Sequence, residues 1–142
     1  MPEEMTPGQR RAVLADGTRT AVLATTRADG RPHAVPVWFA LDDEDVLINT
    51  SEDSVTGRAP QRDPRVTVVA GDEAPPYAFV MGEGVAEMSR DAEDIRWGTA
   101  EIARRYLGGG GSEEFLRYAT GPGEVFFRVR RAHVVAQARI AG

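Results

Sequence analysis

The sequence predicts a mostly β, single-domain protein with peripheral helices, and three features support this fold class. Several apolar, β-branched runs of strand length are separated by turns that contain Gly, Pro or Asp. Two of these runs meet at Ala28-Asp29-Gly30, where an Asp-Gly pair tolerates the positive φ of a tight hairpin turn. Residues 91–107 form the clearest stretch of helical period. The 142 residues suit one domain, 1–142, with a sizeable core.

Composition excludes several classes of function. The chain has no cysteine, which excludes disulfides, thiolate metal sites and a cysteine nucleophile. All 17 basic residues are arginine, so a lysine Schiff base is excluded as well. A net charge of −5 argues against nucleic-acid binding, and no apolar run approaches the roughly 18 residues of a membrane span. The N-terminus lacks a basic start followed by an apolar run, so we expect a cytoplasmic protein.

The N-terminal part of the chain predicts one helix and then three strands. Thr6-Pro7-Gly8-Gln9 has the spacing of a capping box, with proline at the first helical position. This pattern places a helix within 1–17. The strands are expected at the apolar runs that follow, 20–27, 31–41 and 46–50.

The second of these strands has two different faces. Val35, Val37 and Phe39 fall on one face, whereas Pro36 and Trp38 fall on the other. Because proline has no N–H to donate to a strand ladder, one side of this strand should be unpaired or irregular.

The middle of the chain predicts a short helix and two more strands. The helix covers 54–62 and ends before Asp63-Pro64, because a residue that precedes proline disfavours α geometry. The strands follow at 65–70 and 77–89. Gly82 and Gly84 lie inside the longer strand and indicate a bulge or a close backbone approach.

The C-terminal part predicts two helices and a last long strand. Helix 91–107 carries Ile95, Thr99, Ile102 and Tyr106 on one stripe. The glycine run 108–111 ends this helix as a flexible connection, and a shorter helix follows to 119. The last strand, within 123–136, has three apolar residues facing inward, Val125, Phe127 and Val129.

The end of the third strand is the best candidate for a binding site. Thr50, Ser51 and Ser54 offer hydroxyls, the next helix offers free N–H groups, and Arg58 offers a planar cation, a combination that fits a phosphate. The alternative is that Ser54 only caps the helix and Arg58 is solvated. The acidic pair 52–53 beside the site favours this alternative, because carboxylates repel anions.

Other polar features have simpler interpretations. His33 and His133 are the only histidines and are expected on strand surfaces, so no metal site is predicted. The acidic run 42–45 is expected to be a solvated turn. The glycine run 108–111 follows no strand and has no GK[ST] ending, so it is not a phosphate-binding loop.

Five segments, by their order and spacing, resemble the split β-barrel flavin and deazaflavin superfamily, the pyridoxamine 5'-phosphate oxidase-like fold. Within it, the chain is most similar to the actinobacterial oxidoreductases that use coenzyme F420. The segments are LATTRADGRPHAVPVWF (23–39), LINTS (47–51), RDPRVTVV (62–69), YAFVMGEGVAEM (77–88) and ARRYLG (103–108). The resemblance implies a six-stranded antiparallel split barrel of the FMN-binding type. It also implies a homodimer with the cofactor at the subunit interface.

The resemblance further implies cofactor-binding residues but no catalytic side chain. These residues are Pro36, Val37, Trp38, Asn49, Thr50, Ser51, Thr56, Arg58 and Tyr77, with Trp97 as a further pocket candidate. Relatives commonly have a lysine two residues before the arginine of this motif and an asparagine just after it. Here Arg58 matches the arginine, whereas Thr56 and Ala59 replace the other two. The lost charge-assisted hydrogen bond would weaken cofactor binding about tenfold to a hundredfold.

The function that the resemblance implies is that of a reductase carrying reduced F420. Such an enzyme transfers a hydride from the deazaflavin to a small electron-poor organic acceptor. Three alternatives remain open. They are an FMN-dependent oxidase or nitroreductase of the same fold, a non-catalytic cofactor-binding protein, and a haem-binding relative, for which neither histidine has supporting context.

Overall fold

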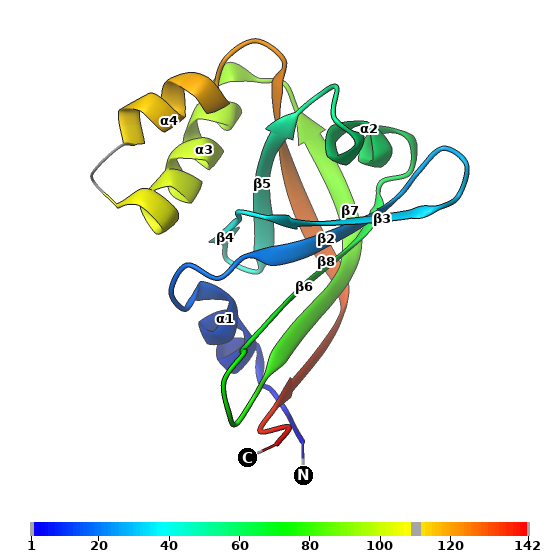
Figure 1. Cartoon of the computed structure of the whole chain (residues 1–142), viewed down its shortest axis with the longest axis vertical. Helices are drawn as coiled ribbons and strands as arrows, with labels where there is room; N and C mark the ends of the chain where they lie inside the picture. The colour runs from blue at the N-terminus through cyan, green and yellow to red at the C-terminus, as the bar shows by residue number, and fades with distance from the viewer. Residues whose placement is uncertain (1, 109–111, 142) are drawn as a thin grey trace.

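The computed structural model describes residues 2–108 and 112–141 of the chain. Within these residues, one eight-stranded antiparallel sheet is surrounded by four helices (Figure 1). The elements in chain order are β1 (Glu3–Glu4), α1 (Pro7–Ala15), β2 (Ala21–Thr26), β3 (Pro32–Val37), β4 (Ala40–Asp42), β5 (Asp45–Ser51), α2 (Val55–Arg62), β6 (Arg65–Gly71), β7 (Phe79–Ser89), α3 (Ala92–Leu107), α4 (Ser112–Ala119) and β8 (Glu124–Ala138).

The sheet curls without closing. Its strand order is β3-β2-β6-β7-β8-β5-β4, with β1 paired to β8, so β3 and β4 are the two ends of the main path. These two strands follow each other in the chain and are joined only through Trp38 and Phe39. The architecture is therefore the predicted split barrel. Pro36 lies on β3, which has a free edge, and this is the unpaired side that its missing N–H predicts.

All six predicted strands are present, and two differences in detail raise the number to eight within the described residues. The predicted strand 31–41 is divided into β3 and β4, because the Phe39 N–H donates to the Tyr106 hydroxyl on α3 at 3.1 Å rather than to a strand. The two-residue β1 was not predicted. Both of its residues, Glu3 and Glu4, are exposed, so no apolar alternation indicates a strand there.

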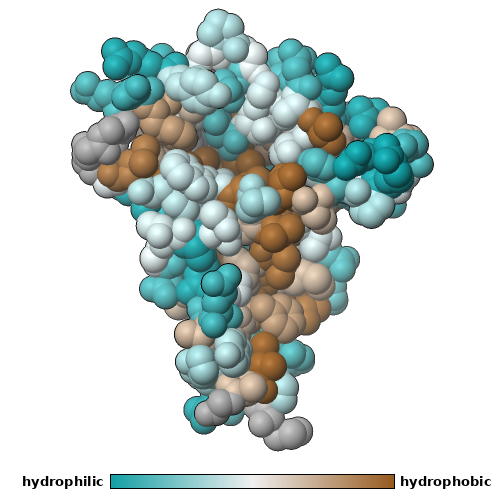
Figure 2. Space-filling view, in the orientation of Figure 1, coloured by the Kyte–Doolittle hydropathy of each residue, from teal (hydrophilic) through white to brown (hydrophobic). Residues whose placement is uncertain are grey.

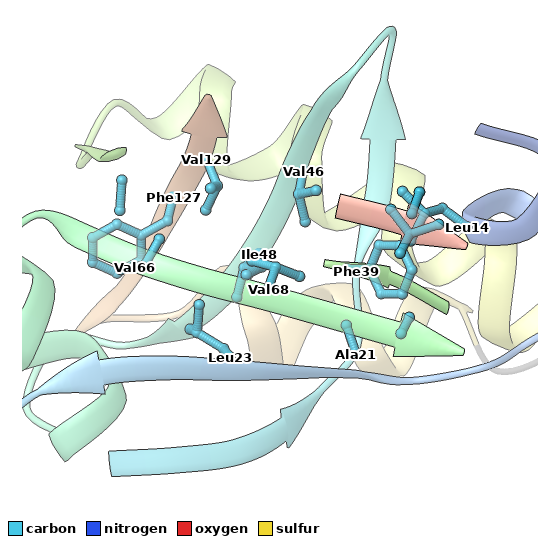
Figure 3. Packing of buried hydrophobic residues seen from close by; sticks show 14 of the residues in the cluster. Leu14, Ala21, Leu23, Phe39, Val46, Ile48, Val66, Val68, Phe127 and Val129 are labelled. Atoms are coloured by element: carbon cyan, nitrogen blue, oxygen red, sulfur yellow. The ribbon is translucent and has the colours of Figure 1, made fainter. Parts of the chain in front are cut away.

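The interior of the barrel is filled by side chains from facing strands. Leu23, Ile48, Val68 and Phe127 are each at most 3% exposed and point into one cluster (Figure 3). Leu14 of α1 joins the same cluster, so α1 covers the barrel end at the lower left of Figure 1. The inward face predicted for the last strand is confirmed, since all three of its predicted inward residues are buried.

A second, smaller core lies between α3 and the outer side of the sheet. Ile95 and Ile102 of α3 pack with Leu47 of β5 and Phe126 of β8. The stripe predicted for this helix is therefore confirmed. Successive residues of β5 and β8 face the two cores in turn, which explains the uninterrupted apolar runs 46–48 and 125–127.

The bulge predicted in the long β7 strand is present. The β7–β8 register shifts between Glu83 and Gly84. A Cβ on Gly84 would lie 2.0 Å from the Arg130 carbonyl oxygen, so only glycine allows the two backbones to approach this closely.

Two further points concern the helices. The connection predicted at 109–111 lies outside the described residues. Over the ranges 2–108 and 112–141, none of the helices combines the length and the apolar character that crossing a bilayer requires.

Candidate functional site

The junction between β5 and α2 brings together two of the predicted hydroxyls, those of Thr50 and Ser54. Ser54 is the N-cap of α2; its Oγ accepts from the Gly57 N–H at 3.0 Å and donates to the Ser51 carbonyl at 2.8 Å. The Thr50 hydroxyl lies 3.3 Å from the same Oγ, and it is the donor because the Ser54 hydrogen is already used. The Ser54 hydroxyl is therefore fully engaged in holding the junction together.

Gly57 seats α2 directly on the end of β5. A Cβ at this position would lie 2.0 Å from the Ser51 carbonyl oxygen and 3.0 Å from its carbonyl carbon. From the sequence alone, this glycine predicts only a weaker helix. The structure shows that it permits a close approach between two backbones, and no local sequence signal reveals the neighbour that requires it.

The first turn of α2 has free donors. Among the described residues, the N–H groups of Val55 and Thr56 have no acceptor. The partial positive charge of a helix N-terminus lies on such N–H groups. Together with a nearby cation, they make an arrangement that can bind an anion.

Arg58 is the predicted cation, and it points toward water. Its side chain is 61% exposed, and its Nη2 lies 4.0 Å from the Asp53 carboxylate, which is 86% exposed. A pair so exposed contributes little to stability, so Arg58 is free to bind a ligand. The second acidic residue at the site, Glu52, is neutralised, because Arg90 Nε donates to its carboxylate at 2.8 Å. Anion repulsion is therefore weaker than the sequence suggests.

Thr56 faces the β2–β3 hairpin. Its hydroxyl lies 3.5 Å from His33 Nε2, and the Nδ1 of that ring lies 3.2 Å from Arg27 Nη2. Neither Arg27 nor His33 was among the predicted binding residues. The hairpin register pairs Thr25 with His33, so Arg27, two residues after Thr25, lies diagonally across from His33 on the same face. This register is the sequence signal that could have placed the two side chains near each other.

A second arginine, Arg65, holds the C-terminal end of α2. Arg65 donates through Nε and Nη2 to Asp63, at 2.9 Å and 2.8 Å. These bonds lower the pKa of Asp63 from 3.8 to about 2. Because the pKa is depressed in the folded protein, the contact stabilises the fold above pH 3.8 and is lost as the pH falls toward 2.

The structure does not gather all of the predicted binding residues at this junction. Asn49 and Ser51 alternate with Thr50 along β5, so they face the opposite side of the strand. The Asn49 amide donates to the Ala119 carbonyl at 2.9 Å and thereby ties the end of α4 to the sheet.

The β3 residues also separate from one another. Pro36 is exposed on the free edge, whereas Val37 packs against the barrel core. Trp38 lies under α3 and α4: its ring stacks on Tyr106 with centroids 4.6 Å apart, and Phe115 is 5.6 Å away. With 41% of its surface exposed, Trp38 still offers an aromatic face at the open side of the barrel.

Tyr77 lies far from α2 within one chain. It precedes β7, next to the C-terminal end of the chain at the bottom of Figure 1, whereas α2 is at the top. Its carbonyl accepts from the Ile140 N–H at 3.1 Å, which fixes it there. Within one chain, Tyr77 is therefore not part of the α2 junction.

A separate hollow of about 620 Å³ lies on the outside of the sheet. It is lined by residues of β2, β6, β7 and β8 that include Thr26, Arg65, Glu83 and His133. None of the nine predicted binding residues lines it. The remaining candidate, Trp97, lies at another hollow of about 190 Å³, so it is not part of the α2 junction either.

The comparisons with known proteins identify the family. The family model described as pyridoxamine 5'-phosphate oxidase matches residues 7–137, and the chain belongs to this family. None of the curated proteins matches the chain.

Solved structures of several proteins have the same fold. A conserved hypothetical protein from Mycobacterium tuberculosis has a TM-score of 0.85 at 24% identity, over 95% of this chain and 86% of that one. An F420 reductase has a TM-score of 0.70 at 22% identity, over 85% of this chain and 92% of that one. An FAD-binding protein from Mesorhizobium loti has a TM-score of 0.72 at 19% identity, over 97% and 96%.

Proposed function

We propose that the protein is an F420-dependent reductase that binds the cofactor phosphate at the junction of β5 and α2. The observation that carries the proposal is the arrangement at this junction. Gly57 seats the helix on the strand, the N–H groups of Val55 and Thr56 have no acceptor in the described structure, and Arg58 is available as a cation. These groups are hydrogen-bond donors, as a phosphate requires. Membership of the oxidase family supports a flavin-type cofactor.

Two observations favour F420 over FMN. Segments 23–39 and 62–69 resemble the F420-using branch, and an F420 reductase is among the structures with this fold. The family name and the FAD-binding neighbour favour FMN or a related flavin as the second candidate.

In this proposal, the chain binds and orients the cofactor, and the cofactor supplies the redox chemistry. A reduced deazaflavin, when bound, supplies a hydride to an electron-poor C=C or C=N bond. Arg58 and the first turn of α2 hold the phosphate and so fix one end of the cofactor. Trp38, whose ring is partly exposed, is the proposed wall that excludes water from one side of the pocket.

We further propose that the protein is a homodimer and that the partner completes the pocket. Five apolar residues lie side by side across the outer face of five strands, in the order Pro36, Val22, Val69, Met81 and Val135. Val22 is 39% exposed, and Figure 2 shows apolar surface running down the middle of this face. A continuous apolar patch of this kind is typical of a protein interface. The distance of Tyr77 from α2 supports the same proposal.

Titration with F420 and with FMN, side by side, tests the cofactor. We expect F420 to bind with micromolar or better affinity, about −8 kcal/mol, and FMN to bind more weakly. Reduced F420 should then be consumed anaerobically when an enone or quinone is added, and hardly at all in air without an acceptor. Binding without turnover would indicate a non-catalytic carrier. FMN retained through purification, with rapid reoxidation by air, would contradict the F420 assignment.

The same titration locates the phosphate when it includes two variants of α2. Arg58→Ala should weaken F420 binding by roughly 1.5–3 kcal/mol, because a charge-assisted hydrogen bond is lost. Arg62→Ala is the matched control, since Arg62 is an exposed arginine in the last turn of the same helix. Equal affinities in the two variants would place the phosphate elsewhere.

A further inference from the structure

The hairpin opposite α2 carries a group of polar side chains that are not among the residues of the phosphate site proposed above. Thr25 and Arg27 alternate along β2 and the turn, and His33 is the cross-strand neighbour of Thr25. These three side chains therefore project from the same face of the hairpin. That face is in contact with α2, where Thr56 meets His33 at 3.5 Å.

Two buried atoms in this group have no hydrogen-bond partner within the described residues. They are Nε of Arg27 and Oγ1 of Thr25, and Thr25 itself is only 4% exposed. A buried polar atom without a partner is costly, and its presence in a folded protein needs an explanation. Both atoms are groups that can donate, so a bound anion would satisfy them.

The contacts of His33 show how the Arg27 guanidinium is held in place. A guanidinium can only donate, so in the 3.2 Å contact between Arg27 Nη2 and His33 Nδ1 the histidine accepts. The histidine proton is then on Nε2, which faces the Thr56 hydroxyl. The Thr56 oxygen accepts this hydrogen bond, so the Thr56 hydroxyl hydrogen is available for a ligand. Arg27, His33 and Thr56 thus form a chain that links the hairpin to the first turn of α2.

The positive charge of Arg27 has no carboxylate partner in the described structure. The nearby hairpin carboxylate, Asp29, is bound by Arg31 Nε at 2.7 Å. Glu52, at the β5 end of the junction, is bound by Arg90. The net charge between the hairpin and the start of α2 is therefore positive, although the chain as a whole is acidic.

We propose that Arg27 is a second phosphate-binding residue, that His33 positions it, and that the site spans the hairpin and α2 with Arg58 on the other side. The proposal rests on the proposed function only in that the phosphate belongs to the cofactor. Arg27 then supplies from the hairpin the cation that position 56 of the helix does not carry.

The test compares ligands with and without a phosphate. Arg27→Met should weaken F420 binding about tenfold to a hundredfold. It should leave the binding of the phosphate-free deazaflavin unchanged. Arg31→Met is the matched control, because it removes the same charge from the same hairpin while Arg31 is already paired with Asp29. The proposal would be overturned if both variants lost the same affinity for F420, or if Arg27→Met lost affinity for both ligands.

Two further variants keep the test decisive if Arg27→Met folds poorly. Arg27→Lys should retain most of the affinity, because the charge remains. Thr56→Lys in the Arg27→Met background should restore F420 binding, because it places a cation at the same junction from the helix side. His33→Gln can both accept from Arg27 and donate to Thr56, so it should bind F420 like wild type, whereas His33→Leu should lose affinity like Arg27→Met.

Inorganic phosphate separates failure of this proposal from failure of the proposed function. Millimolar phosphate should raise the melting temperature of wild type and Arg31→Met, but not that of Arg27→Met, by linkage to the folded state. If F420 does not bind while this pattern holds, the F420 function fails and the site stands. If F420 binds wild type and Arg27→Met equally, the site fails and the function stands.

Discussion

Replacing Gly57 with alanine is expected to destabilise the protein by about 1–3 kcal/mol and to abolish tight cofactor binding. The added Cβ would lie 2.0 Å from the Ser51 carbonyl oxygen and 3.1 Å from Glu52 Cα. Both neighbours are backbone atoms and cannot rotate away. Helix α2 must therefore shift off the end of β5, and it takes the free N–H groups and Arg58 with it.

Gly8→Ala is the matched control for this substitution. Gly8 is also inside a helix, α1, but a Cβ there has no atom within 4 Å. Alanine should stabilise the helix at this position by about 0.4–1 kcal/mol. Urea unfolding measures both changes from the midpoints at an unchanged m-value. Equal stabilisation by the two substitutions would show that α2 does not lie against Ser51.

Val69→Glu is expected to convert the protein from a dimer to a monomer. Val69 is the middle residue of the apolar row on the outer face, between Val22 and Met81. An unpaired carboxylate buried in an interface is strongly unfavourable, and the two-fold symmetry of a dimer introduces it twice. Sedimentation at micromolar concentration should show twice the chain mass of 15.4 kDa for wild type and the single mass for the variant.

The cofactor affinity of the monomeric variant tests whether the site is shared. It should fall with the loss of the dimer, because the proposed dimer brings Tyr77 of the partner to the pocket. Tyr118→Glu is the control: Tyr118 lies on α4 and is not part of the apolar row on the sheet, so the same added charge should leave the dimer intact. A wild-type protein that is monomeric and still binds F420 tightly would refute the shared site.

Local sequence patterns predict most of the fold. The capping box at Thr6, the Asp-Gly turn at Gly30 and the glycines of β7 each identify an element from residues close in the chain. The break between β3 and β4 was not predictable in this way. It depends on a hydrogen bond from Phe39 to Tyr106, which is 67 residues away.

The candidate site was predicted less completely than the fold, for the same physical reason. The hydroxyls around Ser54 and the exposed Arg58 follow from a local pattern of strand, cap and helix. The direction in which the Asn49 side chain points does not follow from a local pattern, because its amide donates to a carbonyl 70 residues away. To predict Arg27 as a site residue, one needs the pairing register of the hairpin and the position of α2, and only the folded structure supplies both.

A crystal structure of the protein with F420 would show directly where the cofactor phosphate binds. We expect a dimer with the cofactor phosphate within hydrogen-bonding distance of the Val55 and Thr56 N–H groups and of the Arg58 guanidinium. The hollow on the outside of the sheet is the competing location, since it is lined by Arg65 and His133. A phosphate bound in that hollow, with no ligand contact at the start of α2, would rule out the junction of β5 and α2 as the cofactor site.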